Sequence, residues 1–334
     1  MKKLATLLLL SLFAALSTTG QAALDSLHSI QSFGDGGLFY MEYTLDYRLE
    51  EILERGVGDD LAYAALISST VMDGRPLPII AVDAGCSSFT GRMEDGAYLM
   101  GRNFDLASPA LPMVIRITPA SGYASLSIAD LGFVGFTIEE RYTALCAPFL
   151  TMDGINEKGL CVSVLRLPGR PTRQDTGKKK IVTLLAVRML LDQAATVDEA
   201  ITLLEGYDMC SSGNDKSYQF MIADASGRTV VVSYPQNKMA VTEAAAATNF
   251  FLPNGSGTGK DRYRTIRAKQ RTTEGAWSEQ EAMALLKRVS LHANAKGGSL
   301  TRWSVVYNLE ALTASILIPS NDEIVYRFAL KRTR

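Results

Sequence analysis

A cysteine, an arginine and an aspartate are spaced so that a β-hairpin would bring them together. Cys86 begins a short strand-like stretch, Asp95-Gly96 is a strong two-residue turn signal, and residues 97–104 have the pattern of the returning strand. Arg102 and Asp105 then come back beside Cys86 at the end of that second strand. The hairpin therefore predicts a thiol nucleophile with a cation and an orienting carboxylate next to it.

Histidine is the usual base for such a thiol, and this chain has only two. His28 lies in the N-terminal segment, and His292 lies at the end of an expected exposed helix. Cleavage between Gly85 and Cys86 would supply another base, because the freed α-amine has a reference pKa of about 7.7–8.0. That amine would share a residue with the nucleophile and could accept its proton near neutral pH. The alternative is that Cys86 is a small buried hydrophobic residue.

The Cys86 hairpin resembles the opening of the choloylglycine hydrolase superfamily of linear-amide hydrolases. This superfamily includes bile salt hydrolases, penicillin V acylases and relatives of N-acylethanolamine acid amidase and acid ceramidase. Its opening cysteine is followed by an arginine and an aspartate at the offsets found here, 16 (102 − 86) and 19 (105 − 86) residues. Three further matches follow in order over most of residues 86–310: the stretch Asp153-Gly154-Ile155-Asn156-Glu157-Lys158-Gly159-Leu160, then Thr248-Asn249, and a weaker Arg302-Trp303-Ser304.

The resemblance implies a fold and a set of roles. The fold is α+β, the four-layer αββα sandwich of N-terminal nucleophile hydrolases, with Gly85 and Cys86 flanking the cleavage site. Asp105 would hold the α-amine, Arg102 would favour the thiolate, and Asn249 would donate its side-chain amide to an oxyanion. The implied catalytic residues are Cys86, Arg102, Asp105, Asn249 and Arg302.

Each of these residues also has a structural interpretation. Arg102 could form an ordinary ion pair, and Asp105 and Asn249 could stabilise turns. Arg302 could either orient the cluster through charge-assisted hydrogen bonds or be exposed.

One position departs from the family pattern. Arg166 lies ten residues beyond Asn156, where bile salt hydrolases have an oxyanion-hole asparagine and penicillin V acylases commonly a tyrosine. An arginine can polarise a carbonyl, so Arg166 is a candidate substrate-binding residue, and the mismatch argues against a bile-salt substrate in particular. Asp153 and Asn156 are expected to form a turn rather than to take part in catalysis.

The N-terminus predicts export. Lys2-Lys3 precedes the apolar stretch 4–16, and small residues follow, so residues 1–22 are expected to be a signal peptide. Residues 23–85 are then a propeptide removed autocatalytically, and residues 86–334 are the catalytic domain. The alternative for residues 24–85 is a small helical subdomain that packs on the rest. The mature protein is expected to be periplasmic or secreted, without a membrane-spanning segment.

Composition excludes several classes of partner and cofactor. The formal net charge is −1, which gives no indication of a nucleic-acid partner. Two histidines and four scattered cysteines argue against a zinc site, and we expect no cofactor. Cys146 and Cys161 could form a disulfide in an exported protein, or all cysteines could remain free. The expected partner is a small-molecule amide with an apolar acyl group, and a homo-oligomer is left open.

Local patterns also predict the main elements. Residues 43–55 and 60–71 have helical periodicity, 181–194 predicts a buried helix, and helices are expected after Thr196 and Ser278, each with a glutamate three residues on. Strands are expected at 114–118, 123–128, 160–167, 218–223, 229–234, 302–309, 314–318 and 323–330, and mobile loops at 168–180 and 255–260.

The sequence leaves more than one function open. It predicts an exported cysteine hydrolase that cleaves linear amides, such as N-acyl amides or conjugated bile acids, through an acyl-enzyme. The alternatives are a penicillin V acylase or an acyltransferase on the same scaffold, or an unprocessed relative that binds lipids or amides without turnover.

Overall fold

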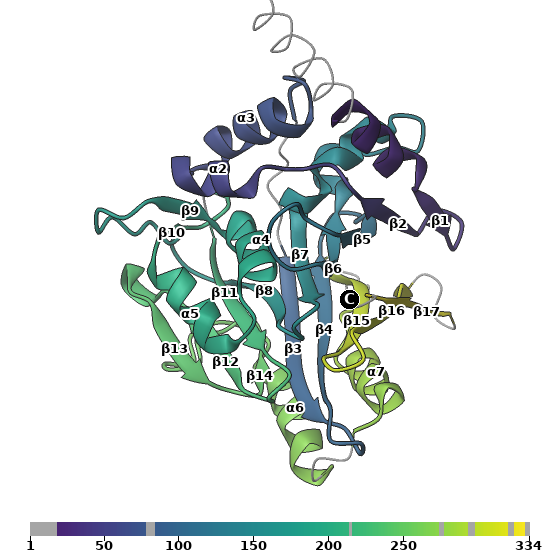
Figure 1. Ribbon diagram of the computed structural model, residues 1–334. Coiled ribbons are helices and arrows are strands. Elements are labelled where there is room, and N and C mark those ends of the chain that lie inside the picture. The colour runs from purple at the N-terminus through teal and green to yellow at the C-terminus, as the bar shows by residue number, and fades with distance from the viewer. Residues whose placement is uncertain are drawn as a thin grey trace, which may run out of the picture.

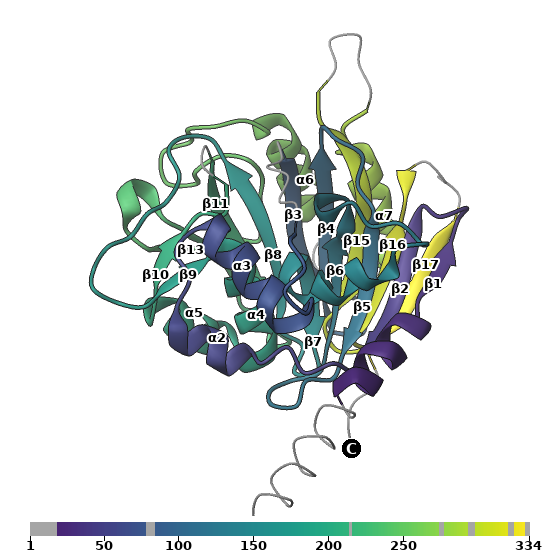
Figure 2. The same ribbon diagram turned by 90° about the horizontal axis from the view of Figure 1, so that it is seen from above.

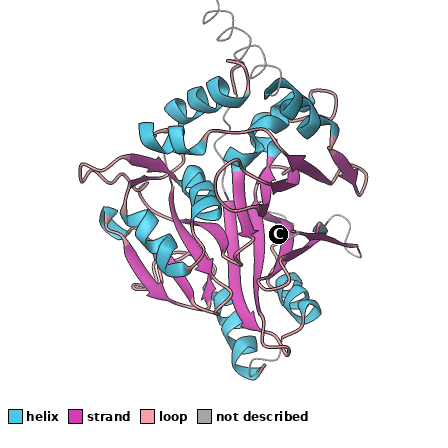
Figure 3. Cartoon of the chain, viewed as in Figure 1, coloured by secondary structure: helices cyan, strands magenta, loops and turns pink. Residues whose placement is uncertain are grey.

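Two β-sheets lie face to face between two layers of helices (Figures 1 and 3). The computed structural model describes residues 19–77, 84–213, 216–273, 277–292, 298–319 and 324–330. The basic start and apolar core expected of a signal peptide, at residues 2–16, lie outside these ranges. Within them, residues 19–28 are helical, so the expected signal cleavage point falls inside a helix.

The first sheet has nine strands and is mostly antiparallel. Its β2 and β5 strands run parallel, although they are far apart in the chain. In spatial order the strands are β1 (Gln31–Phe33), β2 (Leu38–Tyr43), β5 (Pro112–Ile117), β6 (Ser125–Asp130), β7 (Thr151–Asn156), β8 (Cys161–Leu167), β11 (Ser217–Ala223), β12 (Thr229–Ser233) and β13 (Ala240–Glu243).

The second sheet has six strands and contains the hairpin that begins with Cys86. In spatial order they are β14 (Ala246–Ala247), β3 (Ala84–Arg92), β4 (Tyr98–Leu106), β15 (Leu300–Asn308), β16 (Thr313–Leu317) and β17 (Val325–Ala329). A separate parallel pair consists of β9 (Lys180–Val182) and β10 (Asp208–Cys210).

Helices cover the outer faces of both sheets. In Figures 1 and 2, α4 (Thr183–Gln193) and α5 (Val197–Glu205) lie against the nine-stranded sheet, and α6 (Lys260–Thr272) and α7 (Glu279–Arg288) against the six-stranded sheet. The four-layer αββα architecture is therefore confirmed. Besides the helix at residues 19–28, the described ranges contain α2 (Leu49–Arg55), α3 (Asp60–Val71) and the 3₁₀ segments η1 (Leu131–Val134), η2 (Arg141–Leu150) and η3 (Pro235–Asn237).

Local sequence signals account for several of these elements. In the β3–β4 turn, the side chain of Asp95 accepts a hydrogen bond from the amide of Ala97, and Gly96 has a φ of 92°, in the left-handed region that favours glycine. Ser278 begins α7 with the expected capping box, in which Ser278 and Glu281 each accept a hydrogen bond from the other's backbone N–H. These signals position the hairpin and the helix that packs behind it.

The segment before Cys86 is built into the body of the fold. It contributes two strands that the sequence did not predict, β1 and β2, and its expected first helix is shorter because the chain stays extended through Tyr43. The hydroxyls of Tyr43 and Tyr63 donate to the carbonyls of Leu145 and Phe149 at 2.8 and 2.9 Å. The segment therefore completes one edge of the nine-stranded sheet and packs on the 3₁₀ segment at residues 141–150.

Residues 255–259 lie outside helices and strands, as expected of the predicted loop, but Lys260 already begins α6, a helix that was not predicted. Helix α6 buries only Ile266, so its sequence lacks the apolar periodicity that marks a helix. All four cysteines are free and buried, which rules out the Cys146–Cys161 disulfide. No helix in the described ranges is long and apolar enough to span a bilayer.

Candidate active site

Cys86 lies between the two sheets, near the start of β3. Its side chain is buried, and its thiol Sγ lies 3.5 Å from Nη2 of Arg102 and 3.7 Å from the carbonyl oxygen of Val164 on β8. The β3–β4 register places Cys86 opposite Phe104 and Gly85 opposite Asp105. The hairpin thus brings the thiol, the cation and the carboxylate together as its spacing predicted.

Burial works against the thiolate in this uncleaved chain. It raises the pKa of Cys86, while the positive charge of Arg102 acts in the opposite direction. The charge of Asp105 raises the thiol pKa as well, and the backbone N–H of Arg166 and the charge of Arg262 lower it. Cys86 therefore needs a nearby proton acceptor before it can attack a carbonyl.

Arg102 is completely buried and links the two sheets. Its Nη2 donates to the carbonyl of Val164 at 2.7 Å, and its Nε lies 2.8 Å from Oδ2 of Asp153 on β7. That contact has the distance of an ion pair without the alignment of a hydrogen bond. The expectation that Asp153 forms a turn is therefore wrong: it is a buried strand residue that pairs with Arg102. Asn156 does form the turn, because its side chain accepts from the amides of Lys158 and Leu160.

Asp105 is held from two sides. Thr301 on β15 donates to Oδ1 at 2.6 Å, and Arg262 on α6 donates to Oδ2 at 2.8 Å. Burial raises the pKa of Asp105, and the Arg262 charge and the Thr301 hydrogen bond oppose that rise. A Cβ on Gly85 would lie 3.2 Å from Oδ2 of Asp105, so a side chain there would push the carboxylate back by a few tenths of an ångström.

Asn249 faces Cys86 with its acceptor atom. Oδ1 accepts from the backbone N–H of Cys86 at 2.9 Å and from Nη2 of Arg262 at 2.7 Å, while Nδ2 donates to the carbonyl of Arg166 at 2.8 Å. The expected role was donation of the amide to an oxyanion. In this uncleaved chain Nδ2 is already engaged, and Asn249 instead holds the nitrogen that cleavage would convert into the α-amine.

Arg262 is the site residue that the sequence did not reveal. It lies in the first turn of α6 and contacts Ser87 Oγ at 2.9 Å as well as Asp105 and Asn249. Its helix starts after Gly259, whose φ of 78° turns the chain into α6. No spacing rule in the sequence connects this helix to the hairpin, so only the three-dimensional arrangement identifies Arg262.

Arg302 does not join the cluster. The β15–β4 register shifts between Thr301 and Trp303, so Arg302 occupies a bulge while Thr301 takes the position facing Asp105. Its guanidinium donates to the carbonyls of Leu106 and Ala107 at 3.0 and 2.8 Å. The structure thus places Arg302 beside the end of β4 rather than beside the thiol. The second cation of the Cys86 site, after Arg102, is Arg262.

The other candidates lie at the edge of the site or outside it. Arg166 is partly buried, and its backbone contacts Asn249 through the carbonyl. His292 is exposed beyond the end of α7. Among the described residues, no group of three or more His, Cys, Asp or Glu side chains is arranged to hold a metal ion.

This arrangement defines a cysteine-centred site in a four-layer αββα fold. The model of the linear amide C–N hydrolases, choloylglycine hydrolase family, matches residues 86–283, which is more than half of the chain. The chain belongs to this family and is a linear-amide hydrolase.

Solved structures with a similar fold include a conjugated bile acid hydrolase and a penicillin V acylase. Two variants of the conjugated bile acid hydrolase from Clostridium perfringens superpose with a TM-score of 0.55 at 16% identity, over 73% of this chain and 92% of theirs. Penicillin V acylase from Agrobacterium tumefaciens superposes with a TM-score of 0.53 at 17% identity, over 73% of this chain and 86% of its own. A comparison with curated protein sequences gave no match.

Proposed function

We propose that this protein is an exported cysteine hydrolase that cleaves itself before Cys86 and then hydrolyses N-acyl amides with an apolar acyl group. One observation carries the proposal. Asn249 accepts a hydrogen bond from the backbone nitrogen of Cys86, and the thiol of the same cysteine lies next to Arg102. A cut at the Gly85–Cys86 bond would convert that nitrogen into a positioned amine beside its own nucleophile.

Self-cleavage is the first step. The thiol of Cys86 attacks the carbonyl carbon of Gly85, the carbon–nitrogen bond breaks, and the thiol proton ends on the released α-amine. Water then hydrolyses the Gly85 thioester, which leaves a Gly85 carboxylate and a free thiol. The close approach of Asp105 to the Gly85 α-carbon places a carboxylate beside this bond, where it can hold the newly formed amine.

The catalytic cycle reuses the same groups. The α-amine takes the thiol proton, and the thiolate attacks the substrate carbonyl while Arg102 stabilises the negative charge. The resulting ammonium returns its proton to the leaving amine, which forms the acyl-enzyme. Water, activated by the α-amine, then hydrolyses the thioester and releases the acid. Asp105 and Asn249 hold the amine, and Arg262 holds both of them in place.

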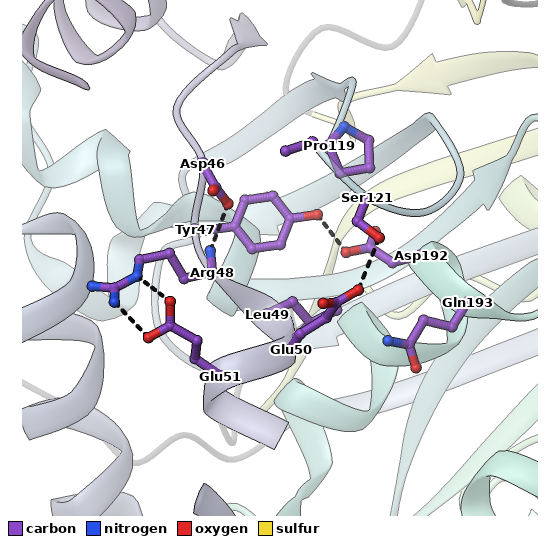
Figure 4. A pocket seen from close by; sticks show the side chains of 11 residues that line it. Asp46, Tyr47, Arg48, Leu49, Glu50, Glu51, Pro119, Ser121, Asp192 and Gln193 are labelled. Atoms are coloured by element: carbon purple, nitrogen blue, oxygen red, sulfur yellow. Dashed lines mark hydrogen bonds and ion pairs between the residues drawn. The ribbon is translucent and has the colours of Figure 1, made fainter. Parts of the chain in front are cut away.

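Residues 24–85 remain bound after cleavage in this proposal. Strand β2 pairs with β5 along five residues, and the tyrosine hydroxyls described above are bonded to the catalytic domain. Figure 4 shows another such contact, where Tyr47 donates to Asp192 at a pocket formed between the two parts of the chain. Losing the segment would expose a strand edge and a large apolar surface, so cleavage yields a two-chain enzyme.

The apolar acyl group is carried over from the expectation for amide hydrolases of this family and from the conjugated bile acid hydrolase of similar fold. Arg166, whose backbone carbonyl accepts from Asn249 at 2.8 Å, would polarise or bind a polar part of the substrate. Export rests on the charged and apolar pattern of residues 2–16.

A substrate panel tests this proposal. Purified protein is incubated with N-acylethanolamines, N-acyl amino acids, conjugated bile acids and penicillin V, and the released amine is measured. We expect hydrolysis of at least one N-acyl amide, and none with the Cys86→Ala variant. Binding of these amides without release of amine would instead favour a non-catalytic binding protein, and transfer to an added amine in preference to water would favour an acyltransferase.

A further inference from the structure

In the part of the chain that the structure describes, two buried clusters each contain an aspartate that is shared by an arginine and a tyrosine. The site triad consists of Arg102, Asp153 and Tyr307. The distal triad consists of Arg188, Asp192 and Tyr47. In both, the arginine and aspartate side chains are at most 1% exposed. Only the site triad contacts the nucleophile, because only Arg102 reaches the Cys86 thiol.

The site triad joins three strands from both sheets. Asp153 on β7 accepts from the Tyr307 hydroxyl of β15 at 2.5 Å through Oδ1, and pairs with Nε of Arg102 on β4 at 2.8 Å through Oδ2. A buried ion is costly unless its partners are well placed. Here Asp153 is the partner of the Arg102 charge, and Tyr307 is a hydrogen-bond donor to Asp153. Tyr307 thus fixes one oxygen of the Asp153 carboxylate, and the other oxygen pairs with the guanidinium of Arg102.

A guanidinium is planar, so fixing two of its edges fixes the whole group. Asp153 holds the Nε edge, the Val164 carbonyl accepts from Nη2 at 2.7 Å, and the Phe104 ring lies 5.1 Å from the guanidinium carbon. The remaining contact of Nη2 is the Cys86 Sγ atom at 3.5 Å. The position of the charge relative to the sulfur is therefore determined by residues that do not touch the sulfur themselves.

We propose that Asp153 is a positioning residue for the reaction, acting through Arg102, with Tyr307 holding Asp153 in turn. It differs from the aspartate of the hairpin, Asp105, which lies on the α-amine side of Cys86. This inference rests on the proposed function, since it assigns Asp153 a part in both self-cleavage and turnover.

The distal triad provides a matched control. Asp192 accepts from Nε and Nη2 of Arg188 at 2.9 and 2.6 Å. It also accepts from the Tyr47 hydroxyl, as Figure 4 shows. It belongs to α4, on the outer face of the nine-stranded sheet. Replacing Asp192 by Asn removes a buried carboxylate from an equivalent environment without changing anything that contacts Cys86.

The experiment compares Asp153→Asn with Asp192→Asn in the full-length protein. The readouts are the rate of self-cleavage, kcat and KM for the amide substrate, the melting temperature, and the pH dependence of Cys86 alkylation by iodoacetamide. We expect both variants to lose thermal stability. Only Asp153→Asn should lose kcat, by about 10²-fold with KM changed less than about threefold, because a misplaced charge weakens the transition state more than it weakens binding.

The alkylation curve tests how Asp153 acts. If Asp153 positions Arg102, its loss weakens the influence of Arg102 on the thiol, and the curve moves to higher pH. If Asp153 acted only as a nearby negative charge, its loss would move the curve to lower pH and overturn the inference. Asp105 and Arg262, the other charges facing the thiol, are unchanged in both variants, so the comparison isolates Asp153.

Several outcomes decide the matter. Normal self-cleavage and kcat in Asp153→Asn, or an equal loss of kcat in Asp192→Asn, would refute the inference while leaving the proposed function intact. A wild-type protein that neither cleaves itself nor hydrolyses amides would refute both. If Asp153→Asn does not fold, Tyr307→Phe is compared with Tyr47→Phe. A fall in kcat confined to Tyr307→Phe supports the inference, and equal effects contradict it.

Discussion

Replacing Arg262 by Gln tests whether the cation on α6 organises the site. Arg262 donates to the carboxylate of Asp105, to the amide oxygen of Asn249 and to the hydroxyl of Ser87, all within 2.9 Å. Glutamine is neutral and its side chain is two atoms shorter, so the variant removes the charge together with these guanidinium contacts. The variant leaves Asp105 buried with Thr301 as its other hydrogen-bond donor among the described side chains.

The expected magnitude follows from the lost charged contact. A hydrogen bond to a charged group contributes about 1.5–3 kcal/mol to stability. Because the Arg262 side chain is 13% exposed, we take about 2 kcal/mol, the lower part of that range. If the same amount is lost from the transition state, kcat/KM should fall roughly 30-fold, since about 1.4 kcal/mol corresponds to a factor of ten.

The pH dependence gives the sign of the effect. Arg262 lowers the pKa of Asp105, so its removal should let Asp105 become protonated at a higher pH than in the wild type. A protonated Asp105 holds the α-amine less well. The loss of kcat/KM in Arg262→Gln should therefore be larger at pH 5 than at pH 8.

Arg264→Gln is the control on the same helix. Arg264 is 73% exposed and pairs with Asp261, which is 93% exposed, so this ion pair contributes little to stability. We expect its kcat/KM to stay within about twofold of wild type. A 30-fold loss in both variants would refute the role assigned to Arg262, as would an Arg262→Gln enzyme whose activity and pH profile match the wild type.

Three further predictions concern Asp105, His292 and Asp130. Asp105→Asn should fold but lose kcat by at least about 10²-fold and stall before self-cleavage, as measured by kinetics and gel analysis; near-normal turnover would return Asp105 to a structural role. His292→Ala should leave kcat and its pH profile unchanged, and a loss of several orders of magnitude would revive a Cys–His pair. Burial raises the pKa of Asp130 to about 6, above its value of 3.8 in an unfolded chain. The protonated Asp130 carboxyl therefore makes its full contribution to the free energy of unfolding below pH 3.8, and this contribution is lost as the pH rises through about 6. Relative to Asp130→Asn, the unfolding free energy of the protein should fall by about 2 kcal/mol between pH 4 and pH 7 in denaturant titrations, and a constant difference would contradict this.

Features encoded by short-range patterns were predicted from the sequence. The β3–β4 hairpin has its turn signal at Asp95-Gly96, and the capping pair of α7 is four residues long. The relation of Cys86 to Arg102 follows directly from the pairing register of that hairpin. Residues on one local element can be placed together from their spacing alone.

Features that depend on distant segments were not predicted. Strand β2 pairs with β5, which follows it about seventy residues later in the chain. No local sequence pattern predicts which distant strand will form such a parallel pair. Arg262 reaches Asp105 from a separate helix, and Asp153 reaches Arg102 from the opposite sheet. Arg302 was misplaced because a single bulge at Thr301–Trp303 exchanges which side chain faces the site.

The central claim is that Cys86 becomes an N-terminal nucleophile, and intact-mass spectrometry of the purified protein tests it most directly. We predict two chains that co-elute under native conditions, one ending at Gly85 and one beginning at Cys86 with a free α-amine. The Cys86→Ala variant should remain a single uncleaved chain. A wild-type protein that hydrolyses amides while its Gly85–Cys86 bond stays intact, or a Cys86→Ala variant that is cleaved at the normal rate, would contradict the account.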